Sequence, residues 1–358
     1  MKQPPPVELA RTIASLAKHV LAGKLLRRDQ ALQLVEAGRE RPYELLAWAG
    51  RVREACFADR VSLCAIVAGK LGACGEDCKW CAQSVRWSAL GDPGGNASGD
   101  ASPRYASSQD VLAAGNLAIQ SRVGRLGIVN SGRRPSRTDI ERLLEAVAQL
   151  RTQQPGLTIC ASLGELQADQ ARQLAQAGVQ RYHHNLETSE RFFGQMVTTH
   201  GYADRLGTLD NARQAGLSIC SGGLFGLGES WEDRVDMALT LRDRVRPDSV
   251  PLNFLTPIAG TPLAGQPKLP PLESLTIIAV LRLLMPRADL RVCGGRLAVL
   301  GELHPWIFQA GATSCMTGNY LTTAGRDPAD DLRLIGQLGL KVVDDQRGVY
   351  PSAGPGNP

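Results

Sequence analysis

Short apolar runs alternate with amphipathic stretches along most of this chain, beginning near residue 61. Each run has the length of one strand, and each following stretch spaces its apolar residues three or four apart, as a helix packed on one face does. Strands are predicted at residues 62–67, 126–130, 157–163, 180–185, 218–222, 250–255, 290–293 and 313–317. Helices are predicted at residues 109–119, 137–152, 165–177, 203–215, 231–244, 271–285, 297–310 and 328–338. Eight strand–helix pairs predict an α/β fold, a (β/α)8 TIM-type barrel with functional groups at the carboxyl ends of its strands.

The residues before this pattern predict an N-terminal helical extension. Apolar positions from Leu9 to Val20 repeat at helical spacing, and a second short helix is predicted between an N-cap at Asp29 and a terminating glycine at Gly38. We expect the extension to cap one end of the barrel. The chain then divides into three predicted parts: the extension at 1–57, the barrel at 58–343 and a loose tail at 344–358.

Three cysteines follow the first predicted strand directly. Cys74, Cys78 and Cys81 have the spacing C-x3-C-x2-C on one short loop. Three thiolates on such a loop are typical of an iron–sulfur cluster, and they leave one iron without a protein ligand. A structural zinc site would need a fourth ligand at regular spacing, and a disulfide would need an oxidising compartment. The loop therefore predicts a cluster with one iron open to a further ligand.

The composition of the chain indicates its cellular location and the state of its thiols. The chain has 358 residues, nine cysteines and a formal net charge of +5. No apolar stretch has the length of a secretory signal or a membrane span, so we expect a cytoplasmic protein with reduced thiols. The basic group Arg133, Arg134 and Arg137 has no interleaved aromatics, which favours a solvated loop over a nucleic-acid site. Residues 88–108 are rich in Gly, Ser, Ala and Asp and predict an excursion that is either a lid or a passive insertion.

The cysteine loop, with Trp80 before its last cysteine, resembles that of radical S-adenosylmethionine enzymes. Four segments resemble the biotin synthase family and occur in that family's order, at residues 70–86, 182–189, 220–229 and 319–323. The resemblance implies a sulfurtransferase that inserts sulfur into dethiobiotin to form biotin, with S-adenosylmethionine on the open iron as the source of a 5′-deoxyadenosyl radical. It also implies a homodimer and an electron donor such as flavodoxin or ferredoxin, and no nucleic-acid or membrane partner.

The resemblance also implies roles for individual residues. They are Cys74, Cys78 and Cys81 for the 4Fe-4S cluster, Trp80, Asn185, Glu187, Gly226 and Glu229 for S-adenosylmethionine, and Asn253, Thr322 and Thr323 for dethiobiotin. Asn185 and Glu187 stand two apart near a strand end and so face the same way. Capping of a strand or helix end is the alternative for these two residues and for the threonines. His183 and His184 are adjacent on a strand, so they face opposite sides and do not predict a shared metal ion.

A second, auxiliary cluster is implied by the resemblance, and here the chain departs from the family. Such a 2Fe-2S cluster is held by three cysteines and one arginine, and Cys160, Cys220 and Arg291 match three of these positions, whereas Gly127 stands at the fourth. A glycine cannot bind iron. Cys64 and Cys293 are possible replacements, because together with Cys160 and Cys220 they occupy alternate strands, which contribute side chains to one layer of a barrel. The alternative is that Cys64 and Cys293 are small buried packing residues.

Two other functions remain open at this point. One is another radical S-adenosylmethionine reaction, such as that of a hydrogenase-cluster maturase or a methylornithine synthase, against which Cys160, Cys220, Arg291 and Asn253 argue. The other is a non-catalytic iron–sulfur carrier, which would not need Trp80, Asn185 and Glu187 around an open iron.

Overall fold

The structure is a computed structural model, and the part of the chain that it describes covers residues 6–87, 102–319 and 325–343. Three of the sequence predictions fall wholly or partly elsewhere. Thr322 and Thr323, the tail at 344–358 and most of the excursion at 88–108 lie outside the described residues.

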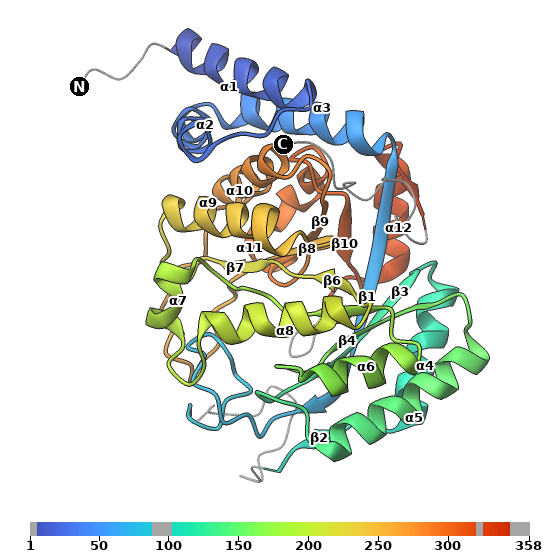
Figure 1. Cartoon of the computed structure of the whole chain (residues 1–358). Coiled ribbons are helices and arrows are strands. Elements are labelled where there is room, and N and C mark those ends of the chain that lie inside the picture. Colours follow the sequence, from blue (N-terminus) through green and yellow to red (C-terminus); the bar gives the residue numbers. More distant parts are fainter. Residues whose placement is uncertain (1–5, 88–101, 320–324, 344–358) are drawn as a thin grey trace.

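Eight parallel strands form a closed barrel, as the sequence predicts (Figure 1). In barrel order they are β1 (Arg60–Leu71), β3 (Arg125–Asn130), β4 (Thr158–Ser162), β5 (Arg181–His183), β6 (Ser218–Cys220), β8 (Ser249–Phe254), β9 (Asp289–Val292) and β10 (Ser314–Met316). Pairing of β10 with β1, in a register that places Ser62 opposite Ser314, closes the ring. Three short strands that we did not predict flank it: β2 (Arg104–Tyr105), β7 (Gly223–Phe225) and β11 (Lys341–Val342).

Helices surround the barrel and supply the other half of its core. They are α4 (Ser108–Gln120), α5 (Arg137–Gln153), α6 (Ala168–Gln176), α7 (Glu190–Met196), α8 (Tyr202–Gln214), α9 (Trp231–Thr240), α10 (Pro271–Leu284), α11 (Arg296–Leu300) and α12 (Pro328–Gln337). Serine side chains cap several of them, as where Ser136 accepts a hydrogen bond from the backbone N–H of Asp139 at the start of α5. The seven-residue α7 was not predicted, because it is too short for a helical period to show.

Two predicted helices differ from the structure for local reasons. The helix predicted at 297–310 ends at Leu300, where Gly301 takes a positive φ of 50°, and continues as a 3-10 helix over Gly301–Ile307 that contains Pro305. Proline has no N–H for an α-helical hydrogen bond, which explains the change. The helix predicted at 231–244 passes from α9 into a π-helical turn over Leu241–Val245.

The extension forms three helices, α1 (Pro6–Leu21), α2 (Arg28–Glu40) and α3 (Pro42–Phe57). They lie at the end of the barrel where β1 begins, and α2 and α3 pack against α9 and α10 (Figure 1). The predicted ends of the second helix were wrong: its N-cap is Arg27, and Gly38 lies inside it. A Cβ at Gly38 would stand 2.5 Å from Cδ2 of Leu45 on α3, so this glycine permits close helix packing and does not end the helix.

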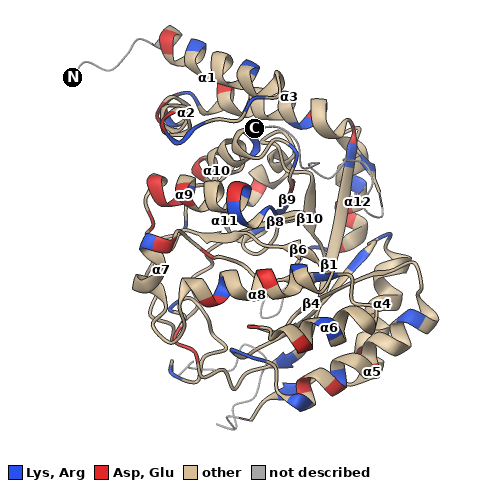
Figure 2. Ribbon diagram, in the orientation of Figure 1, with Lys and Arg blue, Asp and Glu red and all other residues tan. Residues whose placement is uncertain are grey.

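Charged residues of both signs are interspersed along the surrounding helices (Figure 2). Among the described residues, no helix combines the length and the apolar character needed to cross a membrane.

Candidate functional site

The three loop cysteines lie together at the carboxyl end of β1. Cys74 is buried, whereas Cys78 and Cys81 are partly exposed. Burial, and after it the neighbouring thiols, raises the pKa of Cys78 well above its usual range and that of Cys81 to about 11. The thiols of Cys78 and Cys81 are therefore protonated in the absence of metal, and they are close enough to each other to interact. Three such thiols suit three corners of an iron–sulfur cluster, whose iron would displace their protons.

The segment between α7 and α8 fixes the cysteine loop. The backbone N–H of Thr198 donates to Asp77 Oδ1 at 2.9 Å, and the backbone N–H of Asp77 donates to Thr199 Oγ1 at 3.2 Å. Burial opposes ionisation of Asp77, but hydrogen bonds from Thr198 and Thr199 lower its pKa to about 2. The loop between two cysteines is thus held by residues about 120 positions away in the sequence.

A chain of side chains continues from this loop to the end of β5. Glu76 Oε2 lies 2.5 Å from His200 Nδ1, and Arg205 Nη2 lies 3.0 Å from His200 Nε2. Because arginine can only donate, His200 accepts at Nε2 and carries its proton on Nδ1, from which it donates to Glu76. Burial and the charge of Arg205 lower the pKa of His200, which agrees with a neutral ring. Arg205 Nη1 then donates to the backbone oxygen of Asn185 at 2.7 Å.

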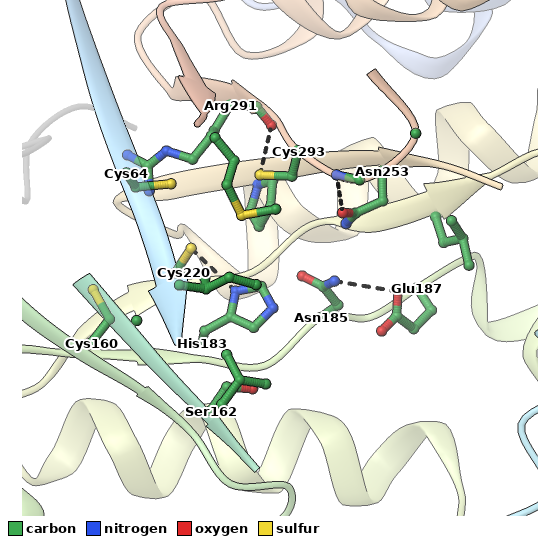
Figure 3. Close-up of a pocket in the computed structure, with 18 of the residues that line it drawn as sticks. Cys64, Cys160, Ser162, His183, Asn185, Glu187, Cys220, Asn253, Arg291 and Cys293 are labelled. Carbon is green, nitrogen blue, oxygen red and sulfur yellow. Dashed lines mark hydrogen bonds between the residues drawn. The ribbon is translucent and has the colours of Figure 1, made fainter. Parts of the chain in front are cut away.

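Asn185 and Glu187 stand at the carboxyl end of β5, facing a cavity (Figure 3). Asn185 Nδ2 donates to Glu187 Oε2 at 3.3 Å, and its Oδ1 accepts from the backbone N–H of Gly222 at 3.1 Å. Asn185 thus makes a backbone bond of the kind the capping alternative expects, while both side chains line the cavity. Glu187 has a φ of 70°, an unusual conformation for a non-glycine residue that is often found at functional sites. Burial raises the pKa of its carboxyl group.

Glu229 and Gly226 are placed differently. The Glu229 carboxylate accepts from the backbone N–H groups of Gly226 at 3.0 Å and Leu227 at 2.7 Å, and from Arg234 Nε at 2.7 Å. Gly226 has a φ of 95°, which a glycine adopts readily. Neither residue lines the cavity, so the structure shows Glu229 folding the turn that Gly226 begins.

A cavity of about 380 Å³ lies inside the barrel. Trp80, which lies within the cysteine loop, lines it together with Asn185, Glu187 and Asn253. The cavity has two chemically different ends (Figure 3): Cys64, Cys160, Cys220 and Cys293 gather at one, and the amide and carboxyl groups of Asn185, Glu187 and Asn253 gather at the other. His183 lies between the two ends, with its Nδ1 3.4 Å from Cys220 Sγ.

The four lumen cysteines come from β1, β4, β6 and the residue after β9, which are alternate strands of the ring. All four are buried. Cys64 and Cys293 also touch Met316, as the packing alternative expects. A hydrogen bond from Cys293, with the charges of Arg291 and Arg125, lowers the pKa of Cys64 despite its burial. The same contact, together with burial, raises the pKa of Cys293.

Gly127 stands beside Cys160, where a Cβ would lie 4.0 Å from the Cys160 Cβ and 3.3 Å from Ile66 Cγ2. Arg291 adjoins the same end of the cavity, but its Nη2 donates to Asp289 at 2.7 Å and its Nε to Ser314 Oγ at 3.1 Å. The residues predicted for an auxiliary cluster therefore line the same end of one cavity, and Arg291 is hydrogen-bonded to Asp289 and Ser314. Among the described residues, no group of three or more His, Cys, Asp or Glu side chains is arranged as a metal site.

The side-chain amide of Asn253 forms hydrogen bonds with the backbone of two neighbouring segments. Its Oδ1 accepts from the N–H of Gly294 at 3.0 Å, and its Nδ2 donates to the oxygen of Gly223 at 3.3 Å. Each amide atom keeps one further hydrogen-bonding site. Asn253 is thereby fixed at the polar end of the cavity, ready to donate to and accept from a polar ligand.

Several residues of this region were missed by the sequence analysis: Glu76, His200 and Arg205 of the side-chain chain, His183, and Arg125, Arg181 and Asp289 inside the barrel. Three of them, His183, Arg125 and Asp289, had a usable signal, because each lies two residues from a position already assigned to the lumen and must face the same side of its strand. Arg133 and Arg134, which we assigned to a solvated loop, pair with Glu165 at 3.0 and 2.7 Å. Arg133 also donates to the backbone oxygen of Thr199, so it supports the segment that holds the cysteine loop.

Comparison with known families agrees with this geometry. The model of the Radical SAM superfamily matches residues 71–241, and that of the Biotin and Thiamin Synthesis associated domain matches residues 251–341. Biotin synthase of Thermodesulfovibrio yellowstonii is 45% identical over 305 residues, covering 84% of this chain and 91% of the relative. Biotin synthase of Trichlorobacter lovleyi is 44% identical over 338 residues, covering 93% of this chain and 97% of the relative.

Solved structures resemble the fold at lower identity. Methylornithine synthase superposes with a TM-score of 0.76 at 21% identity, covering 92% of this chain and 97% of its own. HydG, a maturase of the FeFe-hydrogenase, superposes with a TM-score of 0.77 at 14% identity, covering 95% of this chain and 78% of its own. At such identity the likeness shows the fold alone.

We expect anaerobically reconstituted protein to bind one 4Fe-4S cluster through the loop cysteines. Cys74→Ala, Cys78→Ala or Cys81→Ala removes a ligand and should abolish both the cluster's spectroscopic signal and reductive cleavage of S-adenosylmethionine. Cys56→Ala, on α3 and away from the cavity, is the control and should retain both. Full cleavage activity in any loop variant would contradict the assignment.

Proposed function

The chain belongs to the biotin synthase family of radical S-adenosylmethionine enzymes, and we propose that the two ends of the cavity inside its barrel serve different steps of the family's reaction. The enzyme is a sulfurtransferase that converts dethiobiotin to biotin. The observation that carries the proposal is the continuity of the cavity: the groups beside the cysteine loop and the four lumen cysteines line one space of about 380 Å³. When bound, the 4Fe-4S cluster supplies the electron that cleaves S-adenosylmethionine, and the auxiliary cluster supplies the sulfur.

At the polar end, the chain's own residues position the cofactor. Trp80 offers an aromatic face for the adenine, and Asn185 and Glu187 offer an amide and a carboxylate to the ribose hydroxyls. The chain from Glu76 through His200 and Arg205 ties the cysteine loop to the backbone of Asn185. This link supports a fixed distance between the open iron and the ribose site, which the radical chemistry needs.

Asn253 fits a cyclic urea at the same end, since its amide has one donor and one acceptor to offer, while Thr322 and Thr323 remain proposed partners of the substrate carboxylate. We retain Gly226 and Glu229 as residues of the cofactor site. Their role is indirect, because the turn that they form shapes the backbone near the cavity without lining it. A non-catalytic iron–sulfur carrier would not need a cavity lined by these polar side chains.

At the sulfur end, we propose an auxiliary cluster held by Cys160 and Cys220 with at least one of Cys64 and Cys293, and adjoined by Arg291. Gly127 removes the usual fourth ligand beside Cys160, and the two additional cysteines support a different ligand set around the same place. The cluster is then 2Fe-2S or a variant of it.

Further proposals rest on the family. They are a flavodoxin or ferredoxin as electron donor, a homodimer, a cytoplasmic location, and the division into a helical extension at 1–57, a barrel at 58–343 and a tail at 344–358. The two family models support the barrel as one functional unit, because both matches fall within it.

We expect dethiobiotin to accelerate cleavage of S-adenosylmethionine and to become biotin, as measured by mass spectrometry of the products. Asn253→Ala should lower the biotin formed per 5′-deoxyadenosine by on the order of 10–100-fold, because a misplaced substrate no longer meets the radical. Asn116→Ala, on α4, is the control. If protein with both clusters intact forms no thiolated product, the proposed reaction is wrong and another radical reaction must be sought.

We also expect the auxiliary cluster to depend on the two additional cysteines. A cysteine that only packs can be replaced by alanine at a cost of about 1 kcal/mol with no loss of iron, whereas loss of a ligand leaves iron unsatisfied and the cluster incomplete. Iron and sulfide per chain, with Mössbauer spectra, should therefore fall in the Cys64→Ala, Cys293→Ala double variant.

Cys315→Ala is the matched control, since Cys315 is buried but faces away from the cavity toward Arg296. If the double variant and both single variants retain both clusters and form biotin, then the two cysteines are packing residues and another group completes the site.

A further inference from the structure

The lumen beside the four cysteines is charged, although the lumen of a TIM-type barrel is normally filled by branched apolar side chains. Arg125 from β3, Arg181 from β5 and Arg291 from β9 are each at most 3% exposed. Among the residues that the structure describes, one carboxylate, that of Asp289, lies with them.

Asp289 is paired with two of the three arginines. Asp289 accepts a hydrogen bond from Arg291 Nη2 at 2.7 Å and lies 3.9 Å from Arg125 Nη1. Its other oxygen, Oδ1, accepts hydrogen bonds from Ser314 Oγ at 2.6 Å and from Thr313 Oγ1 at 2.9 Å. Asp289 thus contacts Arg291 and Arg125, and no carboxylate of the described residues is paired with Arg181. Burial of uncompensated charge is costly, which indicates that an anion belongs in this part of the lumen.

Arg181 is the member of the group with the least compensation. Its Nε donates to the Ser218 hydroxyl at 2.9 Å, and no salt bridge to it is found among the described residues. Its Nη1 is fully buried and has no hydrogen-bond partner there either. A guanidinium that is 2% exposed and holds an N–H group without an acceptor points to a ligand that the protein chain does not itself provide.

The strand register places Arg181 directly beside the sulfur end of the cavity. Its Cα pairs with that of Cys160 on β4 and with that of Ser218 on β6, two residues before Cys220. Side chains in register on neighbouring strands share one face of the sheet, so Arg181 and Cys160 both face the lumen. Arg181 therefore lies on the lumen face between the strands that carry Cys160 and Cys220.

We propose that Arg181 is the counter-charge of the auxiliary iron–sulfur cluster: a positioning residue that binds no iron but offsets the negative charge of the thiolates and sulfides held by the lumen cysteines. The inference deepens the proposed function and rests on it. An anionic cluster beside Arg181 offsets its buried positive charge and gives Arg181 Nη1 an acceptor. The same charge favours the reduced form of the cluster, because reduction adds an electron.

The test compares Arg181→Gln with Arg181→Lys in the full chain after anaerobic reconstitution. Glutamine removes the charge and should lower the auxiliary cluster's reduction potential in an EPR-monitored titration, and should lower its iron and sulfide content. Lysine keeps the charge and should restore most of both. Ser218→Ala removes the hydrogen bond to Arg181 without removing the charge, so it should change the potential less than Arg181→Gln. The potential of the 4Fe-4S cluster is the internal control and should not move.

Three results would overturn the proposal. If Arg181→Gln retains the wild-type potential and content of the auxiliary cluster, Arg181 is not its counter-charge. If Arg181→Lys loses the auxiliary cluster as completely as Arg181→Gln while the 4Fe-4S cluster still assembles, Arg181 acts through its size and packing and not through its charge. If a cluster-free protein binds chloride or phosphate at the arginines with the same effect on stability as the cluster, the layer is a general anion site. Absence of any auxiliary cluster in the wild-type protein would instead count against the proposed function.

Discussion

Closure of eight parallel strands into a ring is the constraint on which this protein depends. Once β10 pairs with β1, every second side chain of each strand must face the enclosed lumen. The sequence supplies that lumen with cysteines, arginines, a carboxylate and amides in place of the usual branched apolar residues. The lumen therefore contributes less apolar burial than that of a usual barrel. Apolar side chains of the surrounding helices, above all those of α10, supply buried apolar surface instead.

The side chains of the lumen fall into chemically different groups. The four cysteines lie toward one end of the cavity, and Asn185, Glu187 and Asn253 lie toward the other, near the cysteine loop (Figure 3). The buried arginines and Asp289 adjoin the cysteine end. Each group suits a different part of one reaction: counter-charge, sulfur, and positioning of cofactor and substrate. His183, between the cysteines and the amides, marks the boundary at which sulfur and substrate would meet.

The sequence predicted the barrel because the strand–helix period is local, and it located the cysteine loop and the four lumen cysteines because spacing and period two are local as well. Gly38 was misread, since its function is to admit Leu45 of another helix. Glu76, His200 and Arg205 were missed because their link exists only after α7 and α8 have folded beside the cysteine loop. Arg181 was missed for a different reason: an arginine in a strand is normally read as exposed, and only the closed ring shows that this one is buried.

The central claim, that sulfur passes from the cysteine end of the cavity to a substrate held at the polar end, is tested most directly by isotope transfer. The auxiliary cluster would be assembled with sulfide enriched in 34S, and the protein would then complete a single turnover with dethiobiotin and no free sulfide. The account predicts biotin that carries the heavy isotope. Unlabelled biotin from protein whose auxiliary cluster is fully labelled would contradict it.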